Sequence, residues 1–364
     1  MSNNPNCKWV GCTTTGELSN AGLSRGSAVA MVITSQYIHF GVGVCEYNPK
    51  NPFKTGSTAA QKALQDLKLD KYLDPYLQFT AFKNKEPTEL IRMEPYIFMT
   101  LFPGTTAKYY YEDDLVLDGI VDVTGSIPLI GGSAGDDSKF IKTYTFVNGK
   151  VTNNGCIVVA IVSNLITNIG IKHGYYPTNK IVLVTKSKGK VVNELNNKPA
   201  AIVYSELTGI PLDELKKNPL PYIVTKPFGL ADTQGNYWVK TVLKILDDNS
   251  LLFFAPIKES TALCIMESNE ELILNASKEA IQESVEKVSL KDLELLIIFS
   301  CGARTVYLGQ NLIKEYQLIK KTIGKKPFIG FYTYAEQGRI PNGPIGAFGQ
   351  TFLCMAITNK LFTD

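Results

Sequence analysis

Gly11-Cys12-Thr13-Thr14-Thr15-Gly16-Glu17 is the first of three related motifs, and their recurrence decides how the rest of the sequence is interpreted. The second motif, Gly131-Gly132-Ser133-Ala134-Gly135-Asp136, is one residue shorter, and the third is Gly330-Phe331-Tyr332-Thr333-Tyr334-Ala335-Glu336. Each motif follows two apolar residues and ends in a carboxylate, which is typical of a strand that runs into a tight turn. Glycine permits the turn, and the hydroxyl and carboxylate groups can bind a polar small molecule. A hydrophobic core does not need this chemistry three times.

The composition is that of an ordinary well-packed protein. The chain has 364 residues, of which 45% are hydrophobic and 20% charged, and this length suggests about two or three domains. The net charge of +3 comes from 37 basic and 34 acidic side chains, a balance unlike that of nucleic-acid-binding domains. No apolar run reaches the ~20 residues of a membrane helix. We therefore expect neither a nucleic acid nor a membrane as a partner.

The numbers of cysteines and histidines limit the kinds of site that the protein can contain. The seven cysteines are odd in number and form no CxxC pair, which predicts reduced thiols and a cytoplasmic location. Residues 1–8 are polar, unlike the apolar segment of a secretory signal. Only two histidines occur, His39 and His173, and a multi-histidine metal site is nearly excluded on that count. We predict no bound metal.

The second and third motifs share a lead-in of strand, turn, helix and apolar pair, in residues 95–136 and 293–336. This repetition predicts an internal duplication. The first motif lacks the lead-in, because only ten residues precede Gly11. We therefore expect that an N-terminal strand and helix are missing from the chain or supplied by a partner.

The remaining patterns predict an α+β protein of two related domains, with mixed β-sheets flanked by helices. A helix is expected at 113–123, and strands are expected at 28–34, 76–80 and 237–246. Three prolines between residues 219 and 227 predict an extended segment there.

Several segments resemble the FIST (F-box and intracellular signal transduction) family. Its N-terminal domain is similar to Val10–Glu17, Pro128–Asp137 and His173–Pro177, and its C-terminal domain is similar to Ser300–Arg304 and Gly330–Glu336. The resemblance covers almost the whole chain in the family's order, and it divides the chain into a FIST N-like domain at 1–197 and a FIST C-like domain at 198–364.

Two departures from the family pattern stand out. Ala335 replaces a residue that is usually glycine, and the family's His-Asn-Gln-Thr-like signature appears as Phe348-Gly349-Gln350-Thr351, without the histidine. The resemblance implies an intracellular sensory module that binds a small ligand, such as an amino acid. It also implies a separate signalling partner, because the sequence shows no output domain such as a kinase.

The sequence predicts a ligand pocket where the three motifs converge. Arg304 is expected to face an anionic group, since its planar fork matches a carboxylate, and the motif carboxylates are expected to face donors. Tyr332 and Tyr334 are expected to share one face of a strand. The candidate ligand-binding residues are Thr13, Thr14, Thr15, Glu17, Ser133, Asp136, Asp137, Cys301, Arg304, Tyr332, Tyr334 and Glu336.

Each candidate also has a structural interpretation, in which hydroxyls and carboxylates cap turns and tyrosines pack in the core. Two other functions stay open. Some FIST relatives are haem-binding nitric-oxide sensors, and His173 is the better candidate for an axial haem ligand. An enzyme using Cys301 or a carboxylate pair is the third option, but no histidine has a sequence signature linking it to Cys301 as a base. We therefore predict a non-enzymatic protein.

Overall fold

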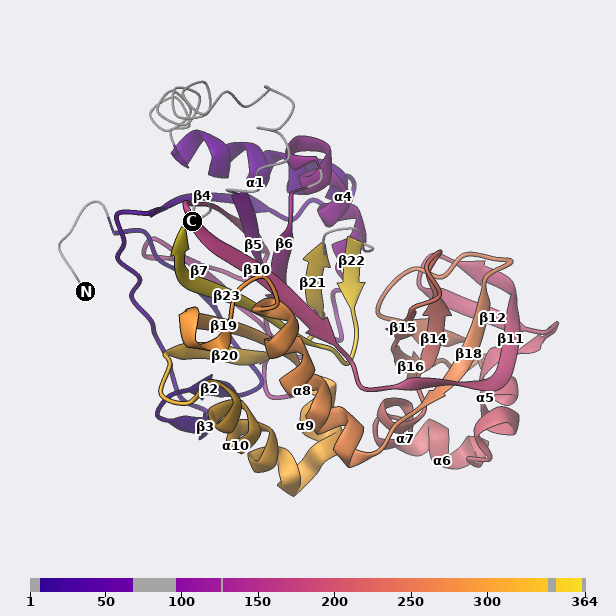
Figure 1. Ribbon diagram of the computed structural model, residues 1–364. Coiled ribbons are helices and arrows are strands. Elements are labelled where there is room, and N and C mark those ends of the chain that lie inside the picture. The colour runs from indigo at the N-terminus through magenta and orange to yellow at the C-terminus, as the bar shows by residue number, and fades with distance from the viewer. Residues whose placement is uncertain (1–6, 68–95, 126, 340–344, 362–364) are drawn as a thin grey trace.

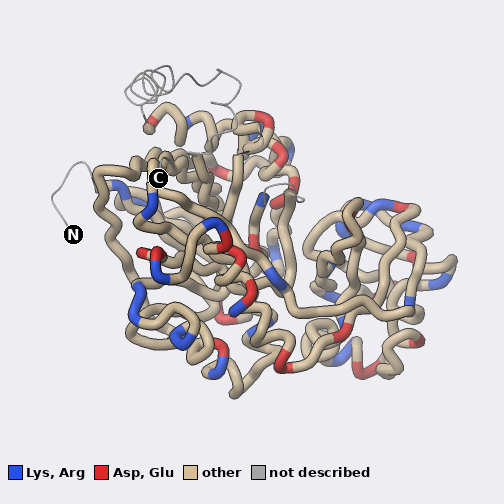
Figure 2. The backbone as a smooth tube through the Cα atoms, viewed as in Figure 1, with Lys and Arg blue, Asp and Glu red and all other residues tan. Residues whose placement is uncertain are grey.

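The computed structural model describes residues 7–67, 96–125, 127–339 and 345–361, which form a large body and a smaller lobe (Figure 1). The body contains segments from both ends of the chain, and the lobe is formed by residues 176–267. Basic and acidic residues are interspersed along both parts of the backbone (Figure 2). The strand expected at 76–80 lies outside the described residues.

Two six-stranded sheets form the centre of the body. The first sheet has the order β22-β21-β6-β5-β9-β4 and the second has the order β3-β2-β20-β19-β23-β10. The strands of the first sheet are β4 (Ile38–Glu46), β5 (Tyr96–Phe102), β6 (Leu129–Ser133), β9 (Gly155–Ser163), β21 (Glu336–Arg339) and β22 (Ile345–Phe348). Those of the second sheet are β2 (Glu17–Ser19), β3 (Gly22–Ser24), β10 (Leu165–Lys172), β19 (Leu293–Cys301), β20 (Phe328–Thr333) and β23 (Phe352–Leu361).

The two sheets are built alike, which confirms the predicted duplication. In each sheet, a parallel pair is joined through helices, β5 with β6 and β19 with β20, as expected for strand–helix–strand units. The connecting helices are α4 (Asp113–Thr124) in the first unit, and α9 (Gly302–Leu308) and α10 (Leu312–Ile323) in the second.

A hairpin from the other half of the chain extends each sheet. The N-terminal hairpin β2–β3 pairs with β20 of the second sheet, while the C-terminal hairpin β21–β22 pairs with β6 of the first. Both sheets therefore contain strands from both halves of the chain. The halves cannot separate without breaking a sheet in each of them.

The sheets pack face to face, and helices cover their outer faces (Figure 1). The core between the sheets contains Ile97 and Ile157 of the first sheet with Ile169 and Leu353 of the second. The first sheet is covered by α1 (Pro52–Leu67) and α4, and the second by α8 (Glu270–Ser284) and α10. The body is thus a four-layer α/β/β/α sandwich, in which each apolar sheet face is buried.

Glycines on the edge strands allow the helices to approach closely. A Cβ atom at Gly43 of β4 would lie 2.0 Å from the carbonyl oxygen of Ala59 in α1. One at Gly170 of β10 would lie 1.8 Å from the carbonyl oxygen of Ala280 in α8. Because β4 and β10 occupy equivalent places in the two sheets, the same packing device serves both halves.

The lobe is inserted between β10 and α8, where the equivalent β4 and α1 are joined by a short connection. Its long strand β11 pairs with β18 on one side and β12 on the other. The lobe strands are β11 (Tyr176–Lys188), β12 (Val191–Leu195), β13 (Lys198–Pro199), β14 (Phe228–Ala231), β15 (Tyr237–Lys240), β16 (Val242–Ile245), β17 (Leu251–Phe253) and β18 (Ala262–Glu267). Its helices are α5 (Ala200–Thr208), α6 (Leu212–Lys217) and α7 (Leu220–Thr225).

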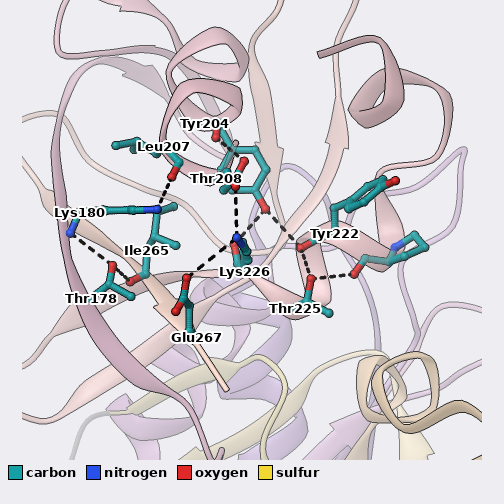
Figure 3. Close-up of polar contacts among 11 residues, drawn as sticks. Thr178, Lys180, Tyr204, Leu207, Thr208, Tyr222, Thr225, Lys226, Ile265 and Glu267 are labelled. Atoms are coloured by element: carbon teal, nitrogen blue, oxygen red, sulfur yellow. Dashed lines mark hydrogen bonds and ion pairs between the residues drawn. The ribbon is translucent and has the colours of Figure 1, made fainter. Parts of the chain in front are cut away.

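Two lysines bind the carboxyl end of α5 and fix it to the lobe sheet (Figure 3). Lys180 Nζ donates to the carbonyl oxygen of Leu207 at 2.7 Å, and Lys226 Nζ donates to that of Thr208 at 3.1 Å. Cations are favourable at this end of a helix, where the last carbonyl groups lack partners. The Tyr204 hydroxyl also donates to the carbonyl oxygen of Lys226 at 2.9 Å.

A three-stranded sheet contains the start of the first motif. Its order is β1 (Val10–Cys12), β7 (Thr145–Val147) and β8 (Lys150–Thr152). The described residues begin at Cys7, and the expectation of a missing strand and helix before this motif stays a prediction.

Three predictions of local structure are wrong. Residues 28–34 alternate between half-buried and exposed positions, as a strand would, but they join no sheet. Residues 237–246 form two strands, β15 and β16, at opposite edges of the lobe sheet. The proline-rich segment contains helix α7, because Pro219 and Pro221 occupy its first turn, where the missing N–H groups cost little. The helix expected at 113–123 is confirmed as α4.

We predict that Gly170→Ala lowers the free energy of unfolding by about 1–3 kcal/mol, since the added methyl group must displace α8 from β10. Gly11→Ala is the matched control, because a Cβ there meets Phe146 at an ordinary 3.4 Å. Urea unfolding of both variants measures the difference. Equal stability of the two variants would contradict the proposed packing role of Gly170.

Candidate functional site

Backbone hydrogen bonds bring the three motifs together. The Thr15 N–H donates to the Tyr332 carbonyl at 3.0 Å, and the Tyr332 N–H donates to the Gly16 carbonyl at 2.9 Å. The second and third motifs repeat this pattern: the Ser133 N–H donates to the Ala335 carbonyl at 2.9 Å, and Tyr334 N–H donates to the Ser133 carbonyl at 3.1 Å. The motifs therefore meet as expected, and the first and second also contact each other, since the Gly135 N–H donates to the Thr13 carbonyl at 2.9 Å.

The carboxylates of the first and third motifs have equivalent partners. Thr14 donates its hydroxyl to Glu17, and Thr333 donates to Glu336 at 2.5 Å. Glu17 also accepts from the Ser27 hydroxyl at 2.7 Å. Both carboxylates thus bind groups of the protein itself and hold the turns, and this geometry matches the structural interpretation of these residues.

Glu336 lies in the protein interior. It is fully buried and accepts hydrogen bonds from the Thr351 hydroxyl at 2.9 Å and the Thr351 N–H at 3.2 Å. Burial raises the pKa of this carboxyl to about 7, although the hydrogen bonds from Thr333 and Thr351 oppose the shift. The Glu336 carboxyl is therefore the motif acid with a pKa near neutrality.

The polar residues of the second motif also bind neighbouring protein groups. The Ser133 hydroxyl donates to Asp113 at 2.7 Å, and burial raises the pKa of Asp113 to about 6. Asp136 accepts the Tyr334 hydroxyl and three backbone N–H groups, those of residues 140–142. These bonds lower the pKa of Asp136 although its partial burial acts in the opposite direction. Asp137 lies nearer the surface, with Lys139 at 3.9 Å.

Arg304 lies in the core and does not line the cleft described below. Its Nε and Nη2 atoms lie 2.9 Å and 2.5 Å from Glu315 Oε1, and Nη2 also donates to the Ser277 hydroxyl at 2.8 Å. The Tyr332 hydroxyl donates to the other oxygen of Glu315 at 2.7 Å. The expected ligand-facing role of Arg304 is therefore replaced by a buried ion pair, and only Nη1 lacks a partner among the described residues.

Tyr332 and Tyr334 do not share surroundings, contrary to expectation. Because β20 ends at Thr333, the chain turns between the two rings. The Tyr332 ring packs in the core beneath α10, whereas Tyr334 stacks on Phe140 with ring centres 4.5 Å apart.

The threonines of the first motif also lie where the three motifs contact one another. The Thr13 hydroxyl accepts from the Tyr144 N–H at 3.0 Å. Thr15 is buried, and its hydroxyl has no hydrogen-bond partner among the described residues. Neither residue lines the cleft described next.

A cleft lies between the body and the lobe, beside the third motif. On the body side it follows the carboxyl ends of the parallel strands β19 and β20, the usual position of ligand sites in such sheets. Of the twelve candidate residues, only Cys301 and Tyr334 line it. The other lining residues are Ser138, Phe140, Leu220, Val224, Val239, Lys240, Thr241, Phe253, Phe254, Ala255, Gly302, Ala303, Val306, Thr333, Ala335, Ala347, Phe348 and Gly349.

The sequence did not predict that residues of the lobe line this cleft. Lys240 and Thr241 lie where β15 ends and β16 begins, inside a segment expected to be one strand. Threonine is common in strands, so the residues between Val239 and Val242 carry no signal for that break. The expectation that the pocket forms around all three motifs needs correction, since neither the first nor the second motif contributes a lining residue.

Cys301 is a poor nucleophile in this setting. Burial, and then the nearby Glu336, raise the pKa of the Cys301 thiol well above its usual value. A reactive cysteine needs the opposite shift, because the thiolate is the nucleophile.

His173 does not suit an axial haem ligand in this arrangement. Its Nδ1 accepts the Tyr175 N–H at 2.9 Å, which leaves the proton on Nε2 to donate to the Tyr237 carbonyl at 2.8 Å. Burial lowers the pKa of the ring to about 4, so the imidazole is neutral. Both nitrogens are therefore engaged, Nδ1 within the body and Nε2 in a contact between body and lobe.

Metal-binding clusters and membrane-spanning helices are both absent from the part of the chain that the structure describes. Within it, no group of three or more histidine, cysteine, aspartate or glutamate residues is arranged to hold a metal ion. The helices of the same residues are all too short or too polar to cross a bilayer.

Comparison with known proteins agrees with the resemblance seen in the sequence. The chain matches the FIST N domain over residues 2–198 and the FIST C domain over residues 200–339. It is also 32% identical over 211 residues to an uncharacterized protein of Methanocaldococcus jannaschii. That alignment covers 54% of this chain but 40% of the relative, so the chain spans less than half of the relative's length.

We predict that Glu315→Gln lowers the free energy of unfolding by about 3–5 kcal/mol, because it leaves the buried Arg304 cation without its counter-charge. The double variant Arg304→Met/Glu315→Leu removes both charges and should recover much of this loss. Urea unfolding measures both. A double variant less stable than Glu315→Gln would contradict this account of the ion pair.

We predict that Glu336 contributes a pH-dependent part of the stability. Since its folded-state pKa of about 7 lies above its ordinary value of 4.5, the stabilisation is present below that ordinary value and is lost as the pH rises through about 7. From about pH 5 to about pH 8, the wild type should lose about 1–3 kcal/mol more stability than Glu336→Gln. Asp113 titrates in both proteins, so its contribution cancels in the comparison. Parallel pH profiles would refute the prediction.

Proposed function

The chain belongs to the FIST family of sensory signal-transduction domains, and on this premise we propose that it binds a small molecule in the cleft between body and lobe. The observation that carries the proposal is the cleft's position. It joins the carboxyl ends of β19 and β20 to the inner edge of the lobe. Ligand sites occur preferentially at such strand ends and at interfaces between structural units.

The cleft suits binding better than catalysis. Its walls are mainly apolar side chains such as Phe253, Phe254 and Phe348, with a small number of polar groups among them. This is the usual composition of a small-molecule site. The Cys301 thiol lines the wall, and its raised pKa opposes its use as a nucleophile. We therefore propose a non-enzymatic sensor.

The cleft composition revises the expected ligand. A small polar molecule such as an amino acid was expected from the hydroxyls and carboxylates of the motifs, but these groups bind one another. We propose instead a ligand with a substantial apolar portion, which covers the phenyl rings of the cleft.

The proposed setting is the cytoplasm, with the output passed to a separate signalling protein. The described cysteines, which are all of the seven in the chain, are free thiols, and four of them are buried. Such usage is typical of proteins from reducing compartments. A ligand that joins body and lobe can alter the surface that such a partner would contact.

We predict that Ala303→Phe abolishes ligand binding, because Ala303 lines the cleft and the phenyl group would occupy its space. A thermal-shift screen with amino acids, nucleotides and apolar organic acids should raise the melting temperature of the wild type. The same compounds should leave Ala303→Phe unchanged. Ala262→Phe, at an exposed position on β18, is the matched control and should respond like the wild type. A folded Ala303→Phe protein that keeps the wild-type response would refute the site.

A further inference from the structure

Lys240 is the cationic side chain of the cleft. It ends β15, and it lines both the cleft and an adjoining cavity that contains Asp114 and Trp238. Neither wall of the cleft contributes another lysine or any arginine among the described residues. The charge of Lys240 is therefore the main electrostatic feature available to a ligand there.

The ammonium group of Lys240 has no ion-pair or hydrogen-bond partner among the described residues. This distinguishes it from the buried Lys190, which donates to the Tyr111 carbonyl and lies 3.9 Å from Glu112. Burial lowers the pKa of Lys240, and Asp114 acts in the opposite direction. Asp114 is itself engaged, since it accepts the Ala347 N–H at 2.8 Å. Lys240 is half-buried in the cleft wall, so an anion placed beside its ammonium group gains a charge-assisted contact that is only partly screened by water.

A second polar group lies next to Lys240. The Thr241 hydroxyl oxygen accepts from Gln350 Nε2 at 3.4 Å, and its hydrogen has no acceptor among the described residues. Lys240 and Thr241 thus contribute a cation and a hydroxyl donor to the wall of a cleft that is otherwise largely apolar. An ammonium and a hydroxyl can bind the same carboxylate or phosphate group.

We propose that the ligand is a small organic anion with an apolar body, whose anionic group pairs with Lys240. The apolar body contacts Phe253, Phe254 and Val239, and Thr241 donates a second hydrogen bond to the anion. This inference rests on the proposed function, because it concerns the same cleft. It adds the chemical class of the ligand and the residues that select its charge.

A matched pair of probes tests the inference in the full-length protein. The probes are 3-phenylpropanoate and 3-phenylpropanamide, which share an apolar body and differ in charge. By titration calorimetry, the wild type should bind the carboxylate at least about tenfold more tightly than the amide, as expected for a charge-assisted contact. Lys240→Met should lose this preference, and Lys240→Arg should retain most of it. Lys244→Met, at an exposed position of β16, is the matched control and should keep the wild-type preference.

The possible outcomes separate the two proposals. Equal affinity of the wild type for both probes, with binding abolished by Ala303→Phe, would overturn the inferred charge selection and leave the cleft as the binding site. A folded Lys240→Met protein that still prefers the carboxylate would overturn the role of Lys240. If neither probe binds the wild type, the inferred ligand class is rejected, whereas binding that survives Ala303→Phe counts against the cleft itself.

Discussion

The hydrogen bonds exchanged among the three glycine-rich motifs are the constraint on which the body depends. Through them the N-terminal hairpin β2–β3 completes the second sheet and the C-terminal hairpin β21–β22 completes the first. Each half of the duplicated chain thus supplies an outer hairpin to the sheet of the other half. The apolar core between the sheets takes residues from both sheets, so the two exchanges connect the strands on either side of it. Glycine is required along this contact: a Cβ at Gly132 would lie 2.6 Å from the Thr333 side chain.

The cleft arises where the two halves differ. β4 leads into α1 within a few residues, but at the equivalent point between β10 and α8 the chain forms the whole lobe. The lobe therefore covers the strand ends of one half only. The equivalent carboxylates show the consequence. Both carboxylates are buried, but Glu17 accepts from Ser27 in an exposed segment, whereas Glu336 lies beside Cys301 at the cleft. Both motifs hold a turn through their carboxylates, and the third motif also contributes residues to the cleft wall.

Local sequence patterns predicted the strand–helix–strand units of this protein. Pairing between distant segments decided how the units assemble and which side chains face the cleft. The duplicated strand–helix–strand units and the meeting of the motifs followed from sequence spacing alone. The exchange of hairpins did not follow from the sequence. The pattern of a strand shows which of its faces is buried, but it does not show which distant strand it pairs with. Arg304 suggested a ligand contact for its planar fork, but the fork also matches Glu315, which the fold places beside it. Lys240 had no motif around it, and only the packing of the lobe against the body shows that its ammonium group is left without a partner.

The connection between lobe and body suggests how ligand binding can be transmitted. The Tyr175 hydroxyl donates to the Val224 carbonyl of the lobe at 2.7 Å and also contacts Gln350 of the body. Gln350 in turn donates to Thr241 at the proposed anion site. A ligand that binds the Thr241 hydroxyl therefore affects the hydrogen bond between Thr241 and Gln350. Gln350 is the residue that contacts Tyr175, where body and lobe are joined. Such a ligand changes the position of the lobe only if it binds one arrangement of the joint more tightly than another. Because Lys240 and Thr241 belong to the lobe while Ala303 and Thr333 belong to the body, closure around a ligand that touches both sides meets that condition.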